Sequence, residues 1–249
     1  DAGVFKVANA LAMGAALLVP GVLAAQLLPM MAKAYGEGPA GAARRIGPTS
    51  AWLFLLGAPL VGFVAVFAEP LIHLLYGNQY AQAAPVLLWL LVGRVAMTLG
   101  QGASAYLVSA DRQTALMVLT LVFSALRLGV AWACIARCGR VGAVAAWGTL
   151  AVRGSGATVW LALHETRTSL PWSRMLRMAL AAALAALCVL PLGALQPPLL
   201  ALLLGGLAYA LLYPVALWLL RCLTPEDADY ARRMASRIGE RFTRGRDQA

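Results

Sequence analysis

Charged residues are scarce in this chain of 249 residues: Asp, Glu, Lys and Arg together make up 12%, against about 25% in an ordinary soluble domain. Hydrophobic residues make up 61% and the mean hydropathy is +0.77, whereas a soluble domain contains about 45–50% apolar residues. A single globular core cannot enclose that much apolar surface. The composition therefore excludes a soluble domain and indicates that lipid is the solvent for much of the chain.

Acidic residues and histidine are especially few, with ten Asp and Glu and two His, and this limits the chemistry available. The pair His164-Glu165 lacks the second histidine of a zinc-protease motif. His73 stands alone, and we find neither a glycine-rich phosphate loop after a strand nor a serine elbow. We therefore expect no catalytic residue, no metal ligand and no cofactor, and interpret the protein as a non-enzyme.

Cysteine is also rare, with four residues at positions 134, 138, 188 and 222. Cys134 and Cys138 are one helical turn apart, which is compatible with a metal or redox pair. No histidine or carboxylate accompanies them, and a buried cysteine commonly behaves as a small hydrophobic residue. We therefore interpret all four as apolar packing residues.

The net charge of +10 could indicate a nucleic-acid partner, but the basic residues lie mostly between apolar runs and in the C-terminal tail. That placement is typical of loops that face an anionic membrane leaflet. We therefore expect membrane lipid, and no nucleic acid, as a partner.

Apolar runs that are long enough to cross a bilayer recur seven times. A transmembrane helix needs about 20 such residues, and the predicted spans cover about 7–32, 49–68, 84–110, 114–136, 141–163, 178–195 and 199–220. Residues 1–223 are therefore predicted to form an all-α membrane protein, a bundle of seven transmembrane helices.

The basic residues between the spans predict the orientation. One side receives Lys33, Arg44, Arg45, Arg112, Arg167, Arg174, Arg177 and the seven arginines from Arg221 onward; the other side receives Lys6, Arg137 and Arg140. By the positive-inside rule the richer side is cytoplasmic. The C-terminus is therefore predicted inside and residue 1 outside. The chain begins at Asp1 without a signal-peptide pattern, so we expect further sequence upstream.

Residues 224–249 are predicted to form a cytoplasmic basic amphipathic helix. Thr224 is a capping residue, Pro225 suits the first helical position, and acidic residues follow in the first turn. Apolar residues then recur at helical spacing, with arginines on the other faces. We interpret the segment as lying on the anionic leaflet, with a frayed charged tail as the alternative.

Three consecutive predicted spans each carry one arginine near the middle: Arg94, Arg127 and Arg153. An arginine at the centre of a membrane helix costs roughly 2.5–3.5 kcal/mol on insertion scales. Each lies on a polar stripe of its own helix, and the stripe of Arg94 includes Gln101. No Asp or Glu occurs in any of the seven spans. We therefore predict a cationic cavity that binds an anionic substrate through Arg94, Arg127, Arg153 and Gln101. The alternative is that some of these arginines extend to an interface or cap backbone carbonyls.

Several motifs resemble those of one transporter family. They are the segment EPLIHLLYGNQY at 69–80 with AAPVL at 83–87, AYLVSADR at 105–112, CGRVGAVAA at 138–146, and GVFKVA at 3–8 with Leu28-Pro29. In this order and spacing they resemble Wzx-type polysaccharide or O-antigen flippases of the multidrug/oligosaccharidyl-lipid/polysaccharide exporter superfamily. The resemblance covers most of residues 1–163, and the three arginines lie outside these motifs.

The resemblance implies a fold and a task. The family has 14 helices in two lobes, so this chain would form helices eight to fourteen, and the missing N-terminal lobe would be a partner. The implied task is to move an anionic, undecaprenyl-pyrophosphate-linked oligosaccharide across the bacterial inner membrane for polysaccharide export, by alternating opening of a cavity between the lobes.

Three other functions stay open at this point. A peptidoglycan-precursor flippase or a multidrug exporter of the same superfamily is the nearest alternative. A cation exporter would need an intramembrane acid, which favours an anionic cargo here. A membrane-embedded polysaccharide polymerase or ligase is expected to have a large external loop, and a scaffold without transport activity would explain a single lobe.

Overall fold

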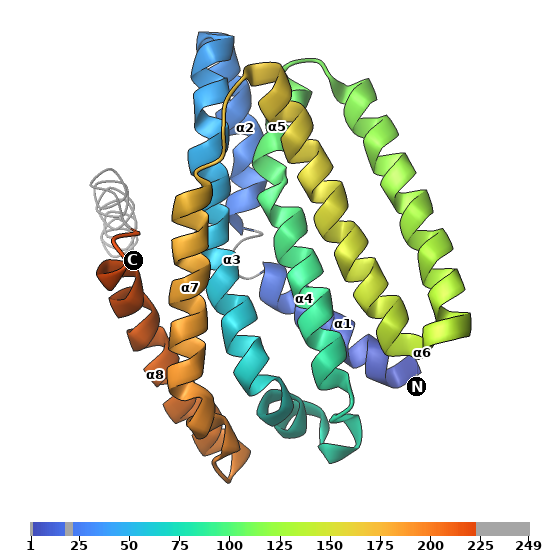
Figure 1. The fold of residues 1–249 in the computed structure, drawn as a ribbon, viewed down its shortest axis with the longest axis vertical. Coiled ribbons are helices and arrows are strands. Elements are labelled where there is room, and N and C mark those ends of the chain that lie inside the picture. The colour runs from blue at the N-terminus through green and yellow to red at the C-terminus, as the bar shows by residue number, and fades with distance from the viewer. Residues whose placement is uncertain (1, 18–21, 223–249) are drawn as a thin grey trace, which may run out of the picture.

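The computed structural model describes residues 2–17 and 22–222, so the predicted basic tail at 224–249 lies outside the described residues. This part of the chain is all-helical (Figure 1). Its elements in chain order are α1 (Ala2–Ala16), α2 (Val22–Glu37), α3 (Pro39–Tyr76), the 3-10 turn η2 (Asn78–Tyr80), α4 (Ala83–Leu99), α5 (Gln101–Ser109), α6 (Gln113–Thr166), α7 (Trp172–Val189), the 3-10 turn η3 (Leu190–Ala194) and α8 (Pro198–Leu219).

Five helical segments in the described ranges are long and apolar enough to cross a membrane. They are Pro39–Tyr76, Ala83–Ser109, Gln113–Cys134, Trp172–Ala194 and Pro198–Leu219. They match the second, third, fourth, sixth and seventh predicted spans. The structure therefore confirms an all-helical chain with the features of a multi-pass membrane protein.

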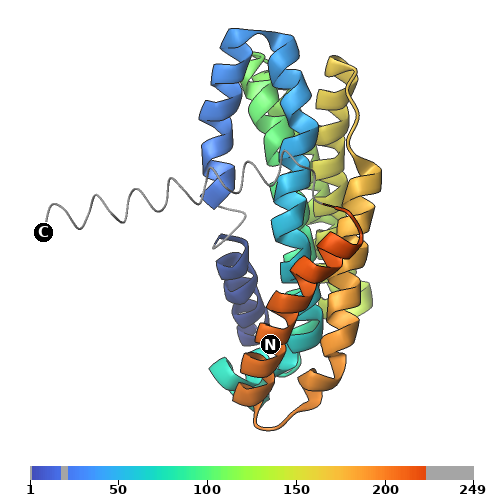
Figure 2. The ribbon, with the colours of Figure 1, turned by 90° about the vertical axis from the view of Figure 1, so that its left-hand side faces the viewer.

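The first and fifth predicted spans are helical but are not among these five segments. The predicted span 7–32 is divided between α1 and α2, which succeed one another along the height of the bundle (Figure 2). The predicted span 141–163 falls in the second half of α6. The total of seven crossings stays a prediction.

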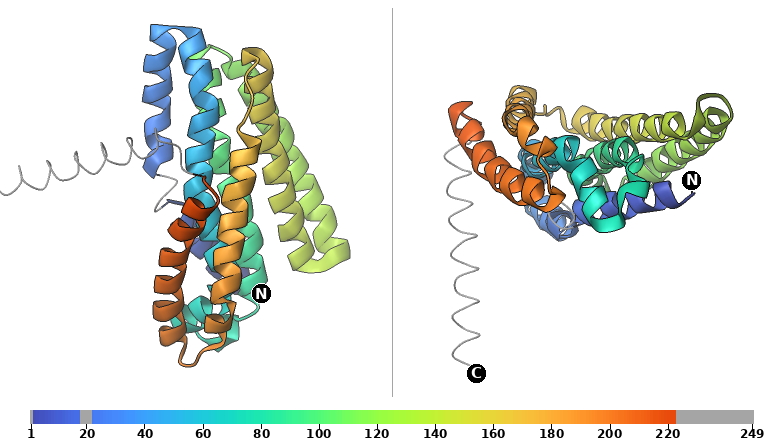
Figure 3. Two further views of the ribbon diagram at one scale, coloured as in Figure 1. Left: turned by 60° about the vertical axis from the view of Figure 1, so that its left-hand side comes forward. Right: turned by 90° about the horizontal axis from the view of Figure 1, so that it is seen from below.

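The long helix α6 folds back on itself near its middle (Figures 1 and 3). We call residues 113–134 the first arm and residues 144–166 the second arm. A Cβ placed on Gly154 would lie 3.2 Å from Nη2 of Arg127 and from Cγ of Phe123. These residues are more than 25 positions apart, so the two arms pack side by side in antiparallel directions. The sequence predicted two spans here, 114–136 and 141–163, which overlap the two arms; that both arms cross the membrane stays a prediction.

Two elements differ from the predicted bounds. The 38 residues of α3 extend about 57 Å at 1.5 Å per residue, well beyond a hydrocarbon core of about 30 Å. The predicted span 84–110 is interrupted at Gly100, between α4 and α5. A Cβ at Gly100 would lie 3.4 Å from Cβ of Ser155, so the second arm approaches closely at this interruption.

The core is distributed around α3, which packs against α2, α4, α5, α7 and α8. One cluster joins α1, α3 and α4, and another joins α3, α7 and α8 around Phe67. Gly205 of α8 allows the ring of Phe67 to occupy the space that a Cβ would need. Seen from below, α7 and α8 lie on one side of α3 and α4 and the arms of α6 lie on the other (Figure 3). The site between α4 and α6 is therefore remote from the α7–α8 pair.

The connections lie at two ends of the bundle. Residue 38 and residues 110–112 and 167–171 lie at one end, at the top of Figure 1, which we call the basic end. Residues 77–82 and 195–197 and the fold of α6 lie at the other end. This alternation agrees with the charge pattern of the connections. That the basic end faces the cytoplasm stays a prediction.

Candidate functional site

Arg94 lies on α4 with its side chain half-buried against α1. Its Nη2 donates a hydrogen bond of 3.2 Å to the side-chain oxygen of Asn9. Its Nε is buried and has no hydrogen-bond acceptor among the described residues. The guanidinium is therefore held at one edge by a neutral amide, which does not neutralise its charge.

Arg127 approaches the same region from the first arm of α6. The Cζ atoms of Arg94 and of Arg127 each lie 5.9 Å from the ring centroid of Trp147. Trp147 comes from the second arm, so one indole ring contacts a guanidinium from α4 and another from the first arm. The Nε of Arg127 is also buried without an acceptor in the described part of the chain. The structure thus places two of the three predicted arginines beside the same indole ring.

Small residues position Trp147. A Cβ at Gly93 would lie 2.9 Å from Cζ3 of Trp147 and 3.3 Å from the Cα of Gly148, and one at Gly148 would lie 3.0 Å from the carbonyl oxygen of Trp89. α4 and the second arm therefore approach through facing glycines, as small residues allow in membrane helices. The indole ring is pressed onto α4 beside Arg94 as a consequence.

The two guanidinium groups have no anionic partner within the described residues. Only two ion pairs occur there, Arg45 with Glu37 at 4.0 Å and Arg112 with Glu165 at 3.5 Å, and both are at the basic end. A cation–π contact contributes about 0.5–2 kcal/mol, which is less than the roughly 2.5–3.5 kcal/mol cost of placing an arginine at mid-membrane. Two like charges around one ring also repel each other. An anion at this point would relieve both costs.

Arg153 and Gln101 are placed differently. The side chain of Arg153 is exposed on the second arm, and we find no hydrogen bond, ion pair or cation–π contact to it within the described ranges. Gln101, the first residue of α5, is exposed as well. Arg153 is adjacent to Gly154, which faces the first arm, and is thereby turned about 100° away from that contact. The predicted roles of Arg153 and Gln101 in substrate binding stay predictions.

Three threonines lie at helical spacing from the predicted arginines, Thr98 from Arg94, Thr120 from Arg127 and Thr149 from Arg153. Thr98, Thr120 and Thr149 each donate to a carbonyl three or four residues earlier, a common arrangement for Thr in helices. Their donors are therefore already used. The guanidinium groups of Arg94 and Arg127 are the main polar feature that this region offers a ligand.

Sequence reasoning missed Asn9 and Trp147. Asn9 carried a usable signal, because a polar residue within a predicted membrane span is uncommon and often functional. Trp147 carried none, because a tryptophan in an apolar run is ordinary. Its importance comes from the glycines across the helix interface.

Other reactive groups do not assemble into a site. The described residues contain no cluster of three His, Cys, Asp or Glu suited to a metal ion. His73 lines a polar pocket at the end opposite the basic end, together with Glu69, Asn78 and Gln196. Cys134, Cys188 and Cys222 are free thiols.

No protein-family model matches this sequence, and no curated protein matches it significantly. The resemblance to polysaccharide flippases therefore stays a prediction.

Proposed function

We propose that this chain is one lobe of a membrane transporter that moves an anionic, lipid-linked oligosaccharide across the bacterial inner membrane. The lobe would have seven spans with a cytoplasmic C-terminus, and a second lobe would complete the path. In this proposal Arg94 and Arg127 bind the pyrophosphate of the substrate, and Arg153 and Gln101 line its route.

One observation carries the proposal: Arg94 and Arg127 lie 5.9 Å from the same ring centroid, each with a buried Nε that has no acceptor in the described structure. Guanidinium groups bind phosphate oxygens in bidentate fashion through such paired N–H donors. Because Arg94 comes from α4 and Arg127 from the first arm of α6, a ligand that binds both would be released if these two helices moved apart. This arrangement suits a carrier better than a fixed ion pair would.

The test is made in cells that depend on the full-length protein for surface polysaccharide. Replacing Arg94, Arg127 and Arg153 together by alanine is expected to abolish surface polysaccharide while lipid-linked units accumulate inside. Lys33→Ala is the control, since Lys33 is an exposed basic residue on α2. Normal polysaccharide in the triple variant would contradict the proposal.

A further inference from the structure

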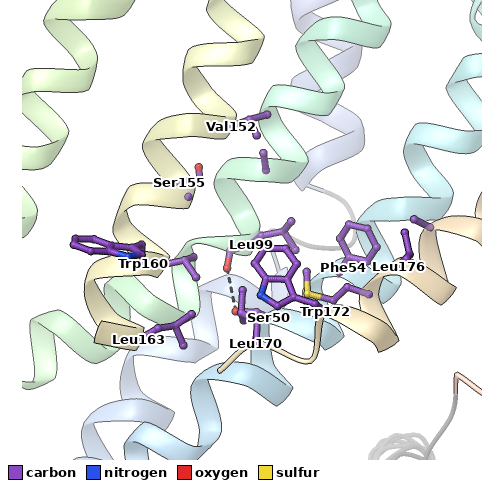
Figure 4. Close-up of a pocket in the computed structure, with 15 residues that line it drawn as sticks. Ser50, Phe54, Leu99, Val152, Ser155, Trp160, Leu163, Leu170, Trp172 and Leu176 are labelled. Carbon is purple, nitrogen blue, oxygen red and sulfur yellow. Dashed lines mark hydrogen bonds between the residues drawn. The ribbon is translucent and has the colours of Figure 1, made fainter. Parts of the chain in front are cut away.

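A second cavity, of about 510 Å³, lies between α3, α4, the second arm of α6 and α7. Its walls include Phe54, Leu99, Val152, Val159, Trp160 and Met175 (Figure 4). The volume falls within the roughly 300–1,000 Å³ typical of small-molecule sites. It is separate from the arginine pair, because its α6 residues lie on a different face of the second arm from Gly154.

The two hydroxyl groups in this groove are already used by the protein. Ser50 donates to the carbonyl oxygen of Leu99 at 3.3 Å, drawn as a dashed line in Figure 4. Ser155 donates to the carbonyl oxygen of Ala151 at 2.9 Å. A polar ligand would therefore lose its hydrogen bonds to water without replacement, which is costly. The walls select a hydrocarbon occupant.

The length of the groove matches half a bilayer. Its lining on α6 extends from Val152 to Leu163, about 16 Å at 1.5 Å per residue. One leaflet contributes about half of a hydrocarbon core that is about 30 Å thick. The groove thus extends from near the basic end to about mid-membrane, the depth that one acyl chain reaches.

The mouth of the groove has features of a membrane interface. The side chains of Trp160 and Trp172 are 63% and 67% exposed, and the ring of His164 lies 5.2 Å from that of Trp160. Tryptophan is enriched at the level of lipid headgroups. The groove therefore offers an apolar stretch suited to a lipid hydrocarbon chain, and at its mouth a region suited to the lipid headgroup.

Positive charge follows immediately beyond the mouth. Arg167 follows the last residue of α6, four residues after Leu163, and its exposed side chain forms no ion pair within the described residues. Arg44 lies one turn before Gly47, whose Cβ position is 3.2 Å from the carbonyl oxygen of Ser169 in the same loop. Arg44 likewise pairs with no carboxylate in the described ranges. These two cations complement an anionic headgroup, with each basic residue near a membrane surface contributing to the attraction.

We propose that this groove, defined by the lining between α3, α4, the second arm and α7, binds one acyl chain of an anionic glycerophospholipid from the leaflet at the basic end. The headgroup lies at Arg167 and Arg44. Because the groove is separate from the arginine pair, this site does not depend on the proposed transport function.

Gly156 offers a specific way to fill the groove. It lines the groove, and a Cβ built there meets nothing within 4 Å. Gly156→Leu therefore places a side chain in the space that the acyl chain would occupy, without a clash. Gly129→Leu is the matched control, because a Cβ at Gly129 of the first arm also meets nothing within 4 Å and Gly129 is remote from the groove.

The experiment measures lipid retention by native mass spectrometry of the full chain from vesicles of equal phosphatidylglycerol and phosphatidylcholine. The wild-type protein and Gly129→Leu should retain phosphatidylglycerol in preference to phosphatidylcholine. Gly156→Leu should weaken that retention about tenfold, because the displaced methylenes lose their apolar contacts. Arg167 has a φ of 53°, and Arg167→Asn keeps a residue that tolerates this left-handed conformation. This variant should reduce the preference for phosphatidylglycerol about fivefold.

Three results would overturn the proposal. They are unchanged retention in Gly156→Leu, equal retention of both phospholipids by the wild-type protein, and displacement of phosphatidylglycerol by added polyprenyl phosphate, which would assign the groove to a carrier lipid. Arg167→Asn alters only an exposed side chain, so an unchanged preference for phosphatidylglycerol in this variant also overturns the proposal, even if Gly156→Leu does not fold.

Discussion

The indole of Trp147 lies on Gly93, so closely that a Cβ at Gly93 would be 2.9 Å from Cζ3 of the ring. This contact sets the distance between α4 and the second arm of α6. It also places the ring in contact with both Arg94 and Arg127. The geometry of the candidate site therefore depends on a residue without a side chain.

Gly93→Ala should destabilise the protein by about 1–3 kcal/mol, because the added methyl group overpacks a close helix interface. The measurement is the unfolding midpoint in detergent. Gly129→Ala is the control: its Cβ meets nothing within 4 Å, and alanine favours helix over glycine by about 1 kcal/mol. Equal loss of stability in both variants would show that the interface does not require Gly93.

Asn9→Asp should separate a structural role of Arg94 from a role in substrate binding. The hydrogen bond of 3.2 Å to Asn9 would become a charge-assisted bond, which is stronger. Stability should therefore be kept or raised while transport of an anionic substrate falls, because the carboxylate competes for the guanidinium. Asn9→Ala is the comparison and should lower stability without supplying a competing charge. Undiminished transport in Asn9→Asp would argue against a substrate site at Arg94.

Tyr213 joins α8 to α3 through a buried hydrogen bond, in which its hydroxyl donates to the carbonyl oxygen of Leu55 at 2.8 Å. Tyr213→Phe should lower stability by about 1 kcal/mol, within the range measured for bonds between membrane helices. Tyr209→Phe should cost less, because the hydroxyl of Tyr209 lies 3.5 Å from its acceptor, the carbonyl oxygen of Ala182. The reverse order would show that the α3–α8 bond is dispensable.

Cys222 lies just beyond α8 and is only 1% exposed. Burial raises the pKa of its thiol, while Arg177 and Arg174 offset part of that rise. In a variant with alanine at the other three cysteines, the alkylation rate should increase with pH through a midpoint above that of a free cysteine peptide. Arg177→Gln removes one offsetting charge and should move this midpoint further upward. A midpoint at or below that of the peptide would contradict the buried position.

Hydropathy predicted much of this fold because a membrane helix must be apolar over its whole length, so each run reveals its own bounds. The candidate spans Gln113–Cys134 and Pro198–Leu219 overlap closely with the predicted 114–136 and 199–220. The interruption at Gly100 was not predicted, because it depends on the approach of Ser155 from another helix. Such contacts leave no periodic signal in the local sequence.

The candidate site was predictable only in part for the same reason. A charge inside an apolar run is conspicuous, and Arg94 and Arg127 were identified on that ground. Which arginines meet depends on helix rotation, which facing glycines and the indole of Trp147 determine. Helical periodicity did not distinguish Arg153 from Arg94 and Arg127, yet the side chain of Arg153 is exposed in the structure.

The central claim is that Arg94 and Arg127 together bind the anionic group of a transported lipid. The most direct measurement is the rate at which the full-length protein, reconstituted in vesicles, translocates a fluorescent polyprenyl-pyrophosphate oligosaccharide. The double variant Arg94→Gln/Arg127→Gln should lose at least about a hundredfold in rate, since the two lost charge-assisted contacts, at about 1.5–3 kcal/mol each, together contribute about 3–6 kcal/mol. The double lysine variant should keep part of the activity, because charge remains without the bidentate geometry. Wild-type translocation by the double glutamine variant would contradict the claim.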